Sequence, residues 1–97
     1  MSEDYIPQIY MAALAGDKNV DCYFTNGAVK RYDVSKAIDL GGVFTPLADQ
    51  KVFESSLLVY DGVLCFDIAG TRDPYEMVDI CADVIYAEGV DIASRAA

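Results

Sequence analysis

Apolar and polar residues alternate along the two segments that flank Asn26 and Gly27. A repeat of two residues is typical of a β-strand with one buried face. An Asn-Gly pair supports the positive φ angles of a two-residue type I′ turn. Residues 20–33 are therefore predicted to form a β-hairpin.

A two-residue turn also predicts which side chains share a face of this hairpin. Phe24 is then opposite Val29, and Tyr23 is opposite Lys30. The apolar face is expected to carry Val20, Cys22, Phe24 and Val29, and the outer face Asp21, Tyr23, Lys30 and Tyr32. Tyrosines on an outer face can bind a partner, and cross-strand packing is the alternative.

A second hairpin is predicted over residues 56–66, around the turn pair Asp61-Gly62. Both of its faces are apolar. One face is expected to carry Leu57, Val59, Leu64 and Phe66, and the other Leu58, Tyr60, Val63 and Cys65. Strands that are apolar on both faces require cover on both sides.

Two further segments surround the first hairpin. Residues 6–15 are predicted to form a strand, although their alanine content also permits a helix. Residues 34–55 are predicted to form a compact connection with one or two short helical turns. The apolar residues expected to pack this connection on the sheet are Ile38, Leu40, Val43, Phe44, Leu47, Val52 and Phe53.

Three sequence signals for the start of a helix occur at residues 73–76. Asp73 offers an N-cap acceptor, Pro74 suits the first helical position, and Glu76 follows two residues later. Gly89 offers a stop. A helix is therefore predicted from about Pro74 to Glu88, with a stripe of Met77, Val78, Cys81, Val84 and Ile85 against the sheet.

These elements together predict a single α+β domain over residues 1–97. Its antiparallel meander sheet has about five strands, from two hairpins and an N-terminal strand, and is packed with the C-terminal helix. Residues 1–4 and 90–97 are expected to be flexible tails. The length of 97 residues suits one hydrophobic core.

Three stretches of the chain resemble a family of small bacterial domains catalogued as domain of unknown function two-four-four-two. Residues 22–33 are similar to its strand, Asn-Gly turn and strand ending in aspartate. Residues 42–53 resemble its glycine, phenylalanine, leucine-x-aspartate and phenylalanine series, and residues 64–76 its closing strand and aspartate-proline-x-glutamate helix start. The resemblance implies the meander with a C-terminal helix and a non-enzymatic interaction role, and it transfers no site residues.

The net charge restricts the partners that the chain can bind. Sixteen acids face seven lysines and arginines, and from Val52 onward nine acids face two bases. Such a surface repels nucleic acid and anionic membranes and attracts basic proteins. No apolar run approaches the roughly 18 residues of a membrane span, and the first four residues carry two acids and no base, so the protein is expected to be soluble and cytoplasmic.

Candidate catalytic and metal-binding groups are few. No histidine is present, and Cys22, Cys65 and Cys81 are widely spaced with no C-x-x-C motif. The cysteines are expected to be reduced core residues. Asp67 and Asp73 could serve an enzyme or a cation site only if they meet in a pocket. No catalytic activity, metal or cofactor is predicted.

Four acids are expected to form a stripe along the predicted helix: Glu76, Asp79, Asp83 and Glu88. Asp79 and Asp83 are four residues apart, a spacing at which like charges destabilise a helix by roughly 0.2–0.5 kcal/mol. Contact with arginines or lysines of a partner would offset that repulsion. An ordinary solvated face is the alternative.

The sequence as a whole predicts a non-catalytic interaction module for a basic or nucleic-acid-handling protein. A sharper version is an inhibitor that presents carboxylates in place of phosphates, as anti-CRISPR, anti-restriction and antitoxin proteins do. The alternative is a structural domain that homodimerises through its sheet, because the second hairpin carries more apolar surface than one helix covers. A small enzyme or a metal-binding protein is the third possibility.

Overall fold

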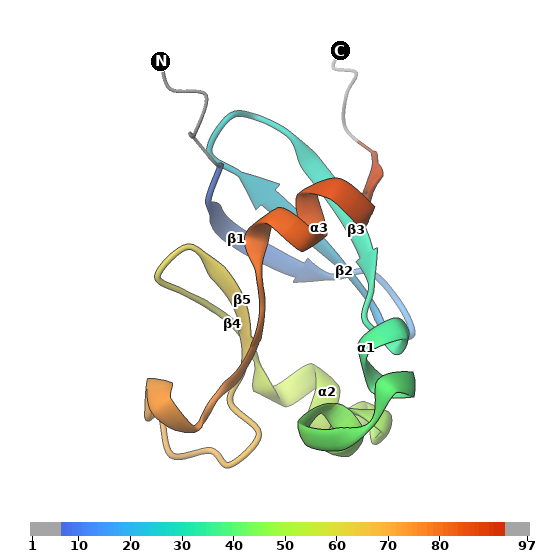
Figure 1. Ribbon diagram of the computed structural model, residues 1–97, viewed down its shortest axis with the longest axis vertical. Coiled ribbons are helices and arrows are strands. Elements are labelled where there is room, and N and C mark those ends of the chain that lie inside the picture. Colours follow the sequence, from blue (N-terminus) through green and yellow to red (C-terminus); the bar gives the residue numbers. More distant parts are fainter. Residues whose placement is uncertain (1–6, 93–97) are drawn as a thin grey trace.

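The computed structural model describes residues 7–92, and two antiparallel β-sheets form its framework (Figure 1). The first half of the chain contributes β1 (Ile9–Leu14), β2 (Asn19–Phe24), β3 (Val29–Asp33), α1 (Ser35–Leu40), the 3₁₀ helix η1 (Gly42–Ala48) and α2 (Gln50–Ser56). The second half contributes β4 (Leu57–Tyr60), β5 (Val63–Phe66), the 3₁₀ helix η2 (Pro74–Glu76), β6 (Val78–Ile80), α3 (Ala82–Glu88) and β7 (Val90–Asp91). The predicted α+β class is confirmed, with the strands divided between two sheets.

The four-stranded sheet has the order β1-β2-β3-β7. The strand predicted within residues 6–15 is confirmed as β1, which pairs antiparallel with β2. Residues 90–91 form β7 and pair with β3. The predicted flexible tail over residues 90–97 is therefore wrong at its start, while residues 93–97 and the predicted tail at 1–4 lie outside the described residues.

The first hairpin has a longer turn than its Asn-Gly pair predicts. The Phe24 N–H donates to the Ala28 carbonyl at 2.8 Å, and the Gly27 N–H donates to the Phe24 carbonyl at 3.0 Å. Residues 25–27 therefore form a three-residue loop, and Gly27 adopts a φ of 94°. This is the arrangement of a type I turn closed by a G1 bulge.

The extra loop residue moves the pairing of β2 and β3 by one position. Tyr32 lies opposite Val20, and Tyr23 lies opposite Val29. Tyr32 is therefore buried at 5% exposure, and its predicted place on the outer face is wrong. The predicted faces of Lys30 and Val29 are wrong for the same reason, since Lys30 lies opposite Cys22 and Val29 opposite Tyr23. A shift by one residue turns every side chain of a strand to the other face of the sheet.

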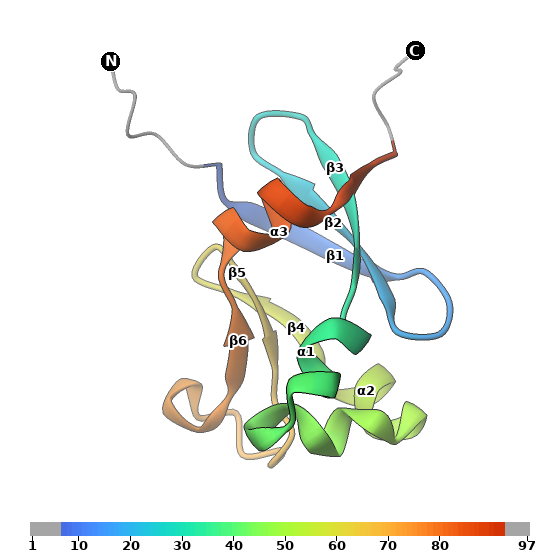
Figure 2. The ribbon, with the colours of Figure 1, turned by 45° about the vertical axis from the view of Figure 1, so that its right-hand side comes forward.

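The three-stranded sheet has the order β4-β5-β6. Asp61 and Gly62 adopt φ angles of 53° and 84°, so the two-residue turn predicted for the second hairpin is confirmed. Leu57 lies opposite Phe66, and Tyr60 lies opposite Val63, as that turn requires. β6 pairs with β5 and forms one edge of the sheet, at the left of the molecule in Figure 2.

The helix predicted from about Pro74 to Glu88 is wrong in its first half. Asp73 does cap a helical turn, because its side chain accepts a hydrogen bond from the Tyr75 N–H at 3.0 Å, but the turn ends at Glu76. The chain then extends into β6, and α3 begins only at Ala82. No helix within residues 7–92 is long and apolar enough to cross a membrane.

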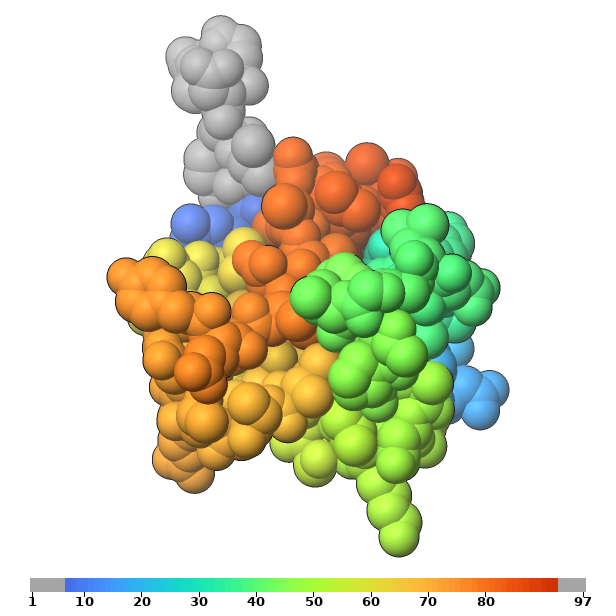
Figure 3. All heavy atoms as spheres, turned by 60° about the horizontal axis from the view of Figure 1, so that its bottom comes forward, coloured from blue at the N-terminus to red at the C-terminus, as the bar shows by residue number. Residues whose placement is uncertain are grey.

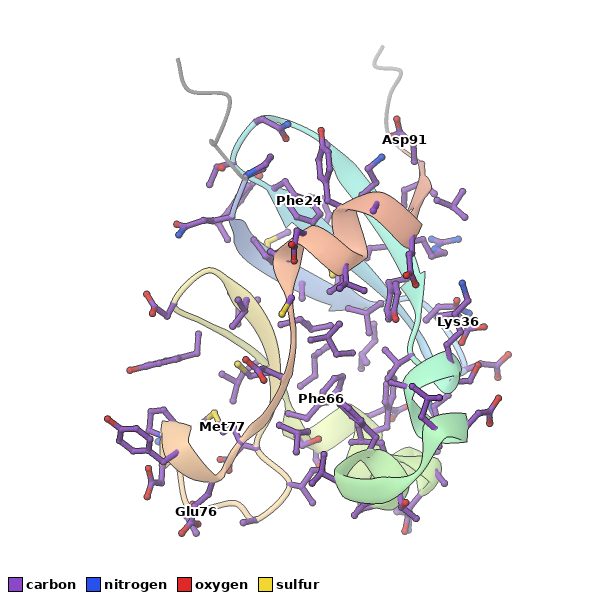
Figure 4. The ribbon with its side chains drawn as sticks, in the orientation of Figure 1. Phe24, Lys36, Phe66, Glu76, Met77 and Asp91 are labelled. Atoms are coloured by element: carbon purple, nitrogen blue, oxygen red, sulfur yellow. The ribbon has the colours of Figure 1, made fainter. Side chains whose placement is uncertain are left out.

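The core lies between the two sheets, α3 and the helical connection of residues 34–56. α3 covers the inner face of the four-stranded sheet (Figure 1), where the rings of Phe24 and Tyr86 meet edge to face at 5.1 Å. Phe66 stacks on Phe53 of α2 at 5.5 Å in the lower part of the core (Figure 4). The core also contains Ile9, Val20, Cys22, Tyr32, Val34, Leu47, Leu64, Ile80 and Ile85.

Candidate functional site

Charged residues divide unevenly between the two halves of the chain. Residues 7–56 carry six acids and five bases, whereas residues 57–92 carry eight acids and one base, Arg72. The one ion pair found within residues 7–92 joins Arg31 Nε to Asp21 Oδ1 at 2.7 Å, on the four-stranded sheet. The uncompensated negative charge therefore lies on the three-stranded sheet, its loops and α3.

The outer face of the three-stranded sheet follows directly from the register of its strands. Cys65 lies opposite Leu58 on one side and Asp79 on the other, and Tyr60 lies opposite Val63. Because side chains alternate along a strand, these five residues point away from the core. The face is therefore apolar along β4 and β5 and carries a carboxylate on β6.

A groove of about 410 Å³ crosses this face between the β4–β5 turn and η2. We call its apolar lining residues Val63, Cys65 and Met77 the floor, and its two tyrosines, Tyr60 and Tyr75, the aromatic walls. Its lining residues are Tyr60, Asp61, Val63, Cys65, Pro74, Tyr75, Met77 and Asp79. Two carboxylates and no lysine or arginine belong to this set. We call it the acidic groove.

The turn at one end of the acidic groove is held by β1. The Ile9 N–H donates to the Gly62 carbonyl at 3.0 Å, which joins the first sheet to the tip of the second hairpin. A Cβ on Gly62 would lie 2.9 Å from Gln8 Cδ, so the turn packs closely against the Gln8 side chain, which directly precedes β1. This contact sets the position of Asp61.

The loop at the other end is held by its own carboxylates. Asp67 accepts hydrogen bonds from the Gly70 and Arg72 N–H groups, each at 3.1 Å. Thr71 Oγ1 donates to Glu76 Oε1 at 2.9 Å. The loop thereby presents the Tyr75 side chain at 97% exposure, while Met77 lies between η2 and the sheet (Figure 4).

The thiol in the floor is not activated for nucleophilic chemistry. Burial raises the pKa of Cys65, and the neighbouring Asp79 carboxylate raises it further. Burial likewise raises the pKa of Cys22 to about 12, with a smaller contribution from Asp21. A reactive thiol requires a lowered pKa. Cys22 and Cys65 are buried as predicted, whereas Cys81 is exposed, so its predicted place in the core is wrong.

The four acids predicted to form one helical stripe lie on three different elements. Glu76 belongs to η2, Asp79 to β6, and Asp83 and Glu88 to opposite ends of α3. Asp79 lines the acidic groove, and Asp83 lines a neighbouring hollow of about 270 Å³ that shares Asp61 with it. The structure thus brings Asp61, Asp79 and Asp83 to one region, and it places Glu76 and Glu88 outside both hollows.

The two tyrosines predicted as partner contacts lie on opposite faces of the four-stranded sheet. Tyr23 lies on the outer face of the four-stranded sheet, with its ring 6.4 Å from that of Tyr10. Tyr32 is buried on the inner face, where burial, then Glu88, then Asp33 raise its pKa. Neither ring reaches the acidic groove.

Sequence reasoning missed Tyr60, Asp61 and Tyr75 as parts of a site. The sequence did contain one signal for this site, because the alternation of the second hairpin predicts Tyr60 and Val63 on the same face. The missing step is the return of the chain as β6, which brings Asp79 to that face.

A larger hollow of about 650 Å³ lies on the far side of Met77, between the loop of residues 67–77 and α2. These two segments lie side by side in the view from below (Figure 3). Arg72 and Asp67 both line this hollow, so its charge is mixed. Its hydroxyl groups are engaged within α2, since Ser56 Oγ donates to the Val52 carbonyl at 2.7 Å.

The described residues contain no group of three histidine, cysteine or acidic side chains arranged to hold a metal ion. The acidic groove itself combines two carboxylates with two tyrosines and apolar side chains. Comparison of the chain with protein-family models, with curated proteins and with solved structures finds no match. The resemblance described above stays a prediction, and the inference about function rests on the geometry.

Proposed function

We propose that this protein is a non-catalytic, acidic interaction module that binds a basic protein, and that the acidic groove is its main contact. The observation that supports the proposal best is the composition of the groove. Asp61 and Asp79 line it together with two tyrosines, and no base lines it.

The surrounding field favours the same class of partner. The eight acids and one base of residues 57–92 act together, because the summed field of many charges sets the early association energy. Electrostatic steering of this kind raises the association rate most at low salt. The partner is therefore a protein with a basic surface.

In its more specific form, the proposal is that the partner is itself a protein that binds or processes nucleic acid. Its phosphate-binding surface is already shaped and charged for a chain of anions, so an acidic module can occupy that surface as an inhibitor. Anti-CRISPR, anti-restriction and antitoxin proteins belong to this functional class. It predicts that nucleic acid and the module compete for the partner. We infer a cytoplasmic location, in keeping with three reduced cysteines.

Fluorescence anisotropy with a short labelled peptide of alternating lysine and glycine tests the proposal. Raising NaCl from about 0.1 M to about 1 M shortens the Debye length from about 10 Å to about 3 Å, so binding should weaken by about tenfold or more. The Asp61→Asn, Asp79→Asn double variant should weaken binding about 3- to 10-fold, the sum of two exposed ion pairs. Asparagine keeps the Asp61 turn intact, because Asn-Gly also favours type I′ geometry.

Asp17→Asn, Asp39→Asn is the matched control, since it removes two exposed charges from the other half of the chain. Asp17 has a φ of 48°, which asparagine tolerates. Equal loss of affinity in the two double variants would mean that net charge alone acts and that the groove has no role. Absence of any salt-sensitive binding would end the proposal.

A structural homodimer is a second candidate, and one observation favours it. The outer face of the four-stranded sheet exposes Tyr10 at 62% and Val90 at 65%, with Met11 and Ile92 beside them. Arg31 and Asp21 on that face neutralise each other. The strands β1 and β2 have six residues each, β3 has five and β7 has two. Together they cover about 300 Å² per protomer, less than half the area of a stable interface, so such a dimer is weak.

Sedimentation velocity over a range of protein concentrations tests the dimer. Added salt should strengthen it, because screening reduces repulsion between two chains of net charge −9. Added salt should instead weaken binding at the acidic groove, so the two effects of salt have opposite signs. The Tyr10→Thr, Val90→Thr variant should stay monomeric. A wild-type monomer at every concentration and salt level would exclude this candidate.

A further inference from the structure

We propose that the acidic groove is built for the side chain of a single arginine of the partner, stacked against Tyr60 and Tyr75 and hydrogen-bonded to Asp61 and Asp79. This inference rests on the proposed function and narrows the partner to one that offers an exposed arginine. It depends on the shape and lining of the groove and not on the overall charge.

The lining residues offer a contact for each part of an arginine side chain. Val63, Cys65 and Met77 provide an apolar floor for the three-carbon stem. Asp61 stands at the turn and Asp79 on β6, so carboxylates stand at two places along the groove. A guanidinium carries five N–H donors in a fixed plane, so it can donate hydrogen bonds to a carboxylate of the groove.

The aromatic walls favour arginine over lysine. A planar, weakly hydrated guanidinium stacks on a tyrosine face, whereas a lysine ammonium holds its water more strongly. Tyr75 is 97% exposed and Tyr60 is 48% exposed, so both rings have faces free for contact.

The backbone that carries the two walls is held in place before any ligand arrives. The loop bearing Tyr75 is tied by the Asp67 and Asp73 carboxylates to its own N–H groups. The turn bearing Asp61 is tied to β1. A preorganised site loses less conformational entropy on binding, which favours a short ligand.

The test compares two labelled peptides of equal length, one alternating arginine with glycine and the other lysine with glycine, by fluorescence anisotropy. The wild-type protein should bind the arginine peptide about 3- to 10-fold more tightly, the range expected of one cation–π stack. Tyr75→Leu and Tyr60→Leu should each reduce that preference. Tyr10→Leu, the same change at an exposed tyrosine of the other sheet, should leave it unchanged.

A structural readout accompanies the affinities. Stacking on the tyrosine rings should move the arginine Hδ proton signals of the peptide upfield in NMR spectra, and Tyr75→Leu should abolish that shift. Circular dichroism confirms that the variants fold, which is expected because the Tyr75 ring is solvent-exposed.

The outcomes separate this inference from the proposed function. One outcome is that the two peptides bind equally well, with binding weakened by the Asp61→Asn, Asp79→Asn variant but not by the tyrosine variants. That result overturns the arginine pocket and leaves the proposal of an acidic interaction module intact. Binding of neither peptide overturns both. A preference for arginine that is lost equally in Tyr10→Leu overturns the assignment to this groove.

Discussion

Gly89 allows the packing of α3 on β3 to be tested with one substitution. Its φ is −73° and its ψ is 159°, so its backbone is extended and any residue can adopt it. A Cβ at this position would lie 2.7 Å from the Ile85 carbonyl oxygen and 2.9 Å from Lys30 Cβ. The glycine is therefore required by close approach to its neighbours and not by its backbone angles.

We predict that Gly89→Ala lowers the free energy of unfolding by about 1–3 kcal/mol, the usual cost of overpacking a close contact. The nearest atoms belong to α3 (the Ile85 carbonyl oxygen) and to β3 (Lys30 Cβ), so relief requires residue 89 to shift relative to the end of α3 and away from β3. In a domain of this length, the melting temperature should fall by about 4–8 °C for each kcal/mol. Urea and thermal unfolding followed by circular dichroism measure both quantities.

A second substitution separates close approach from backbone strain. Asparagine tolerates the left-handed region that alanine avoids, so it partly replaces a glycine held there by its φ. Gly27 is the matched case, because its φ is 94° and a Cβ added to it would meet no atom within 4 Å. Gly27→Asn should therefore be milder than Gly27→Ala, whereas Gly89→Asn should be at least as destabilising as Gly89→Ala. A milder asparagine at position 89 would refute the packing of α3 described above.

Four further predictions concern stability and titration. Asp67→Ala should destabilise the protein by about 1–2 kcal/mol in urea unfolding, because two backbone N–H groups lose a charged acceptor; no loss would contradict the loop geometry. In the native protein at pH 8, a thiol reagent should react rapidly with Cys81 alone, and two rapid thiols would contradict the burial of the others. The folded pKa of Cys22 is raised from 9.0 to about 12, so its contribution to stability is present below pH 9 and is lost as pH rises toward 12; Cys22→Ala should flatten this decline. Ser35→Ala should raise the lowered pKa of Asp33, measured by carbon NMR titration, since the Ser35 hydroxyl makes the largest contribution to that lowering and the Ser35 N–H, which alanine keeps, a further one; an unchanged pKa would exclude the hydroxyl bond as its cause.

Local turn chemistry made both hairpins predictable. Asp61-Gly62 adopts the two positive φ angles that its residues favour, and the register of β4 and β5 follows. Asn26-Gly27 also forms a turn, but Gly27 closes a three-residue loop there. The residue pair permits both loop lengths, so the face on which Tyr32 lies could not be read from it.

The segment after Glu76 shows where the periodic pattern was ambiguous. Val78 and Ile80 alternate with Asp79 as a strand requires, yet three residues are too few to separate this repeat from a helical one. The free edge of β5 decides the outcome, because its N–H and C=O groups gain partners when β6 pairs beside it. Neither the caps nor the apolar spacing contains that information.

The candidate site was predictable only in part. The second hairpin pattern correctly groups Tyr60, Val63 and Cys65 on one face. Tyr75 and Asp79 join them because the loop of residues 67–77 folds back over the sheet. The expected acidic stripe depended on a continuous helix, and it disappears with that helix.

The amino-acid sequence by itself determined the α+β class, the two hairpins and the negative charge, since these depend on local backbone preferences and on composition. Only the tertiary structure decided that the strands form two sheets, that Tyr32 is buried, and that Asp61 and Asp79 share a groove with two tyrosines. Those features depend on hydrogen bonds and packing between segments distant along the chain, whose free energy no local pattern contains.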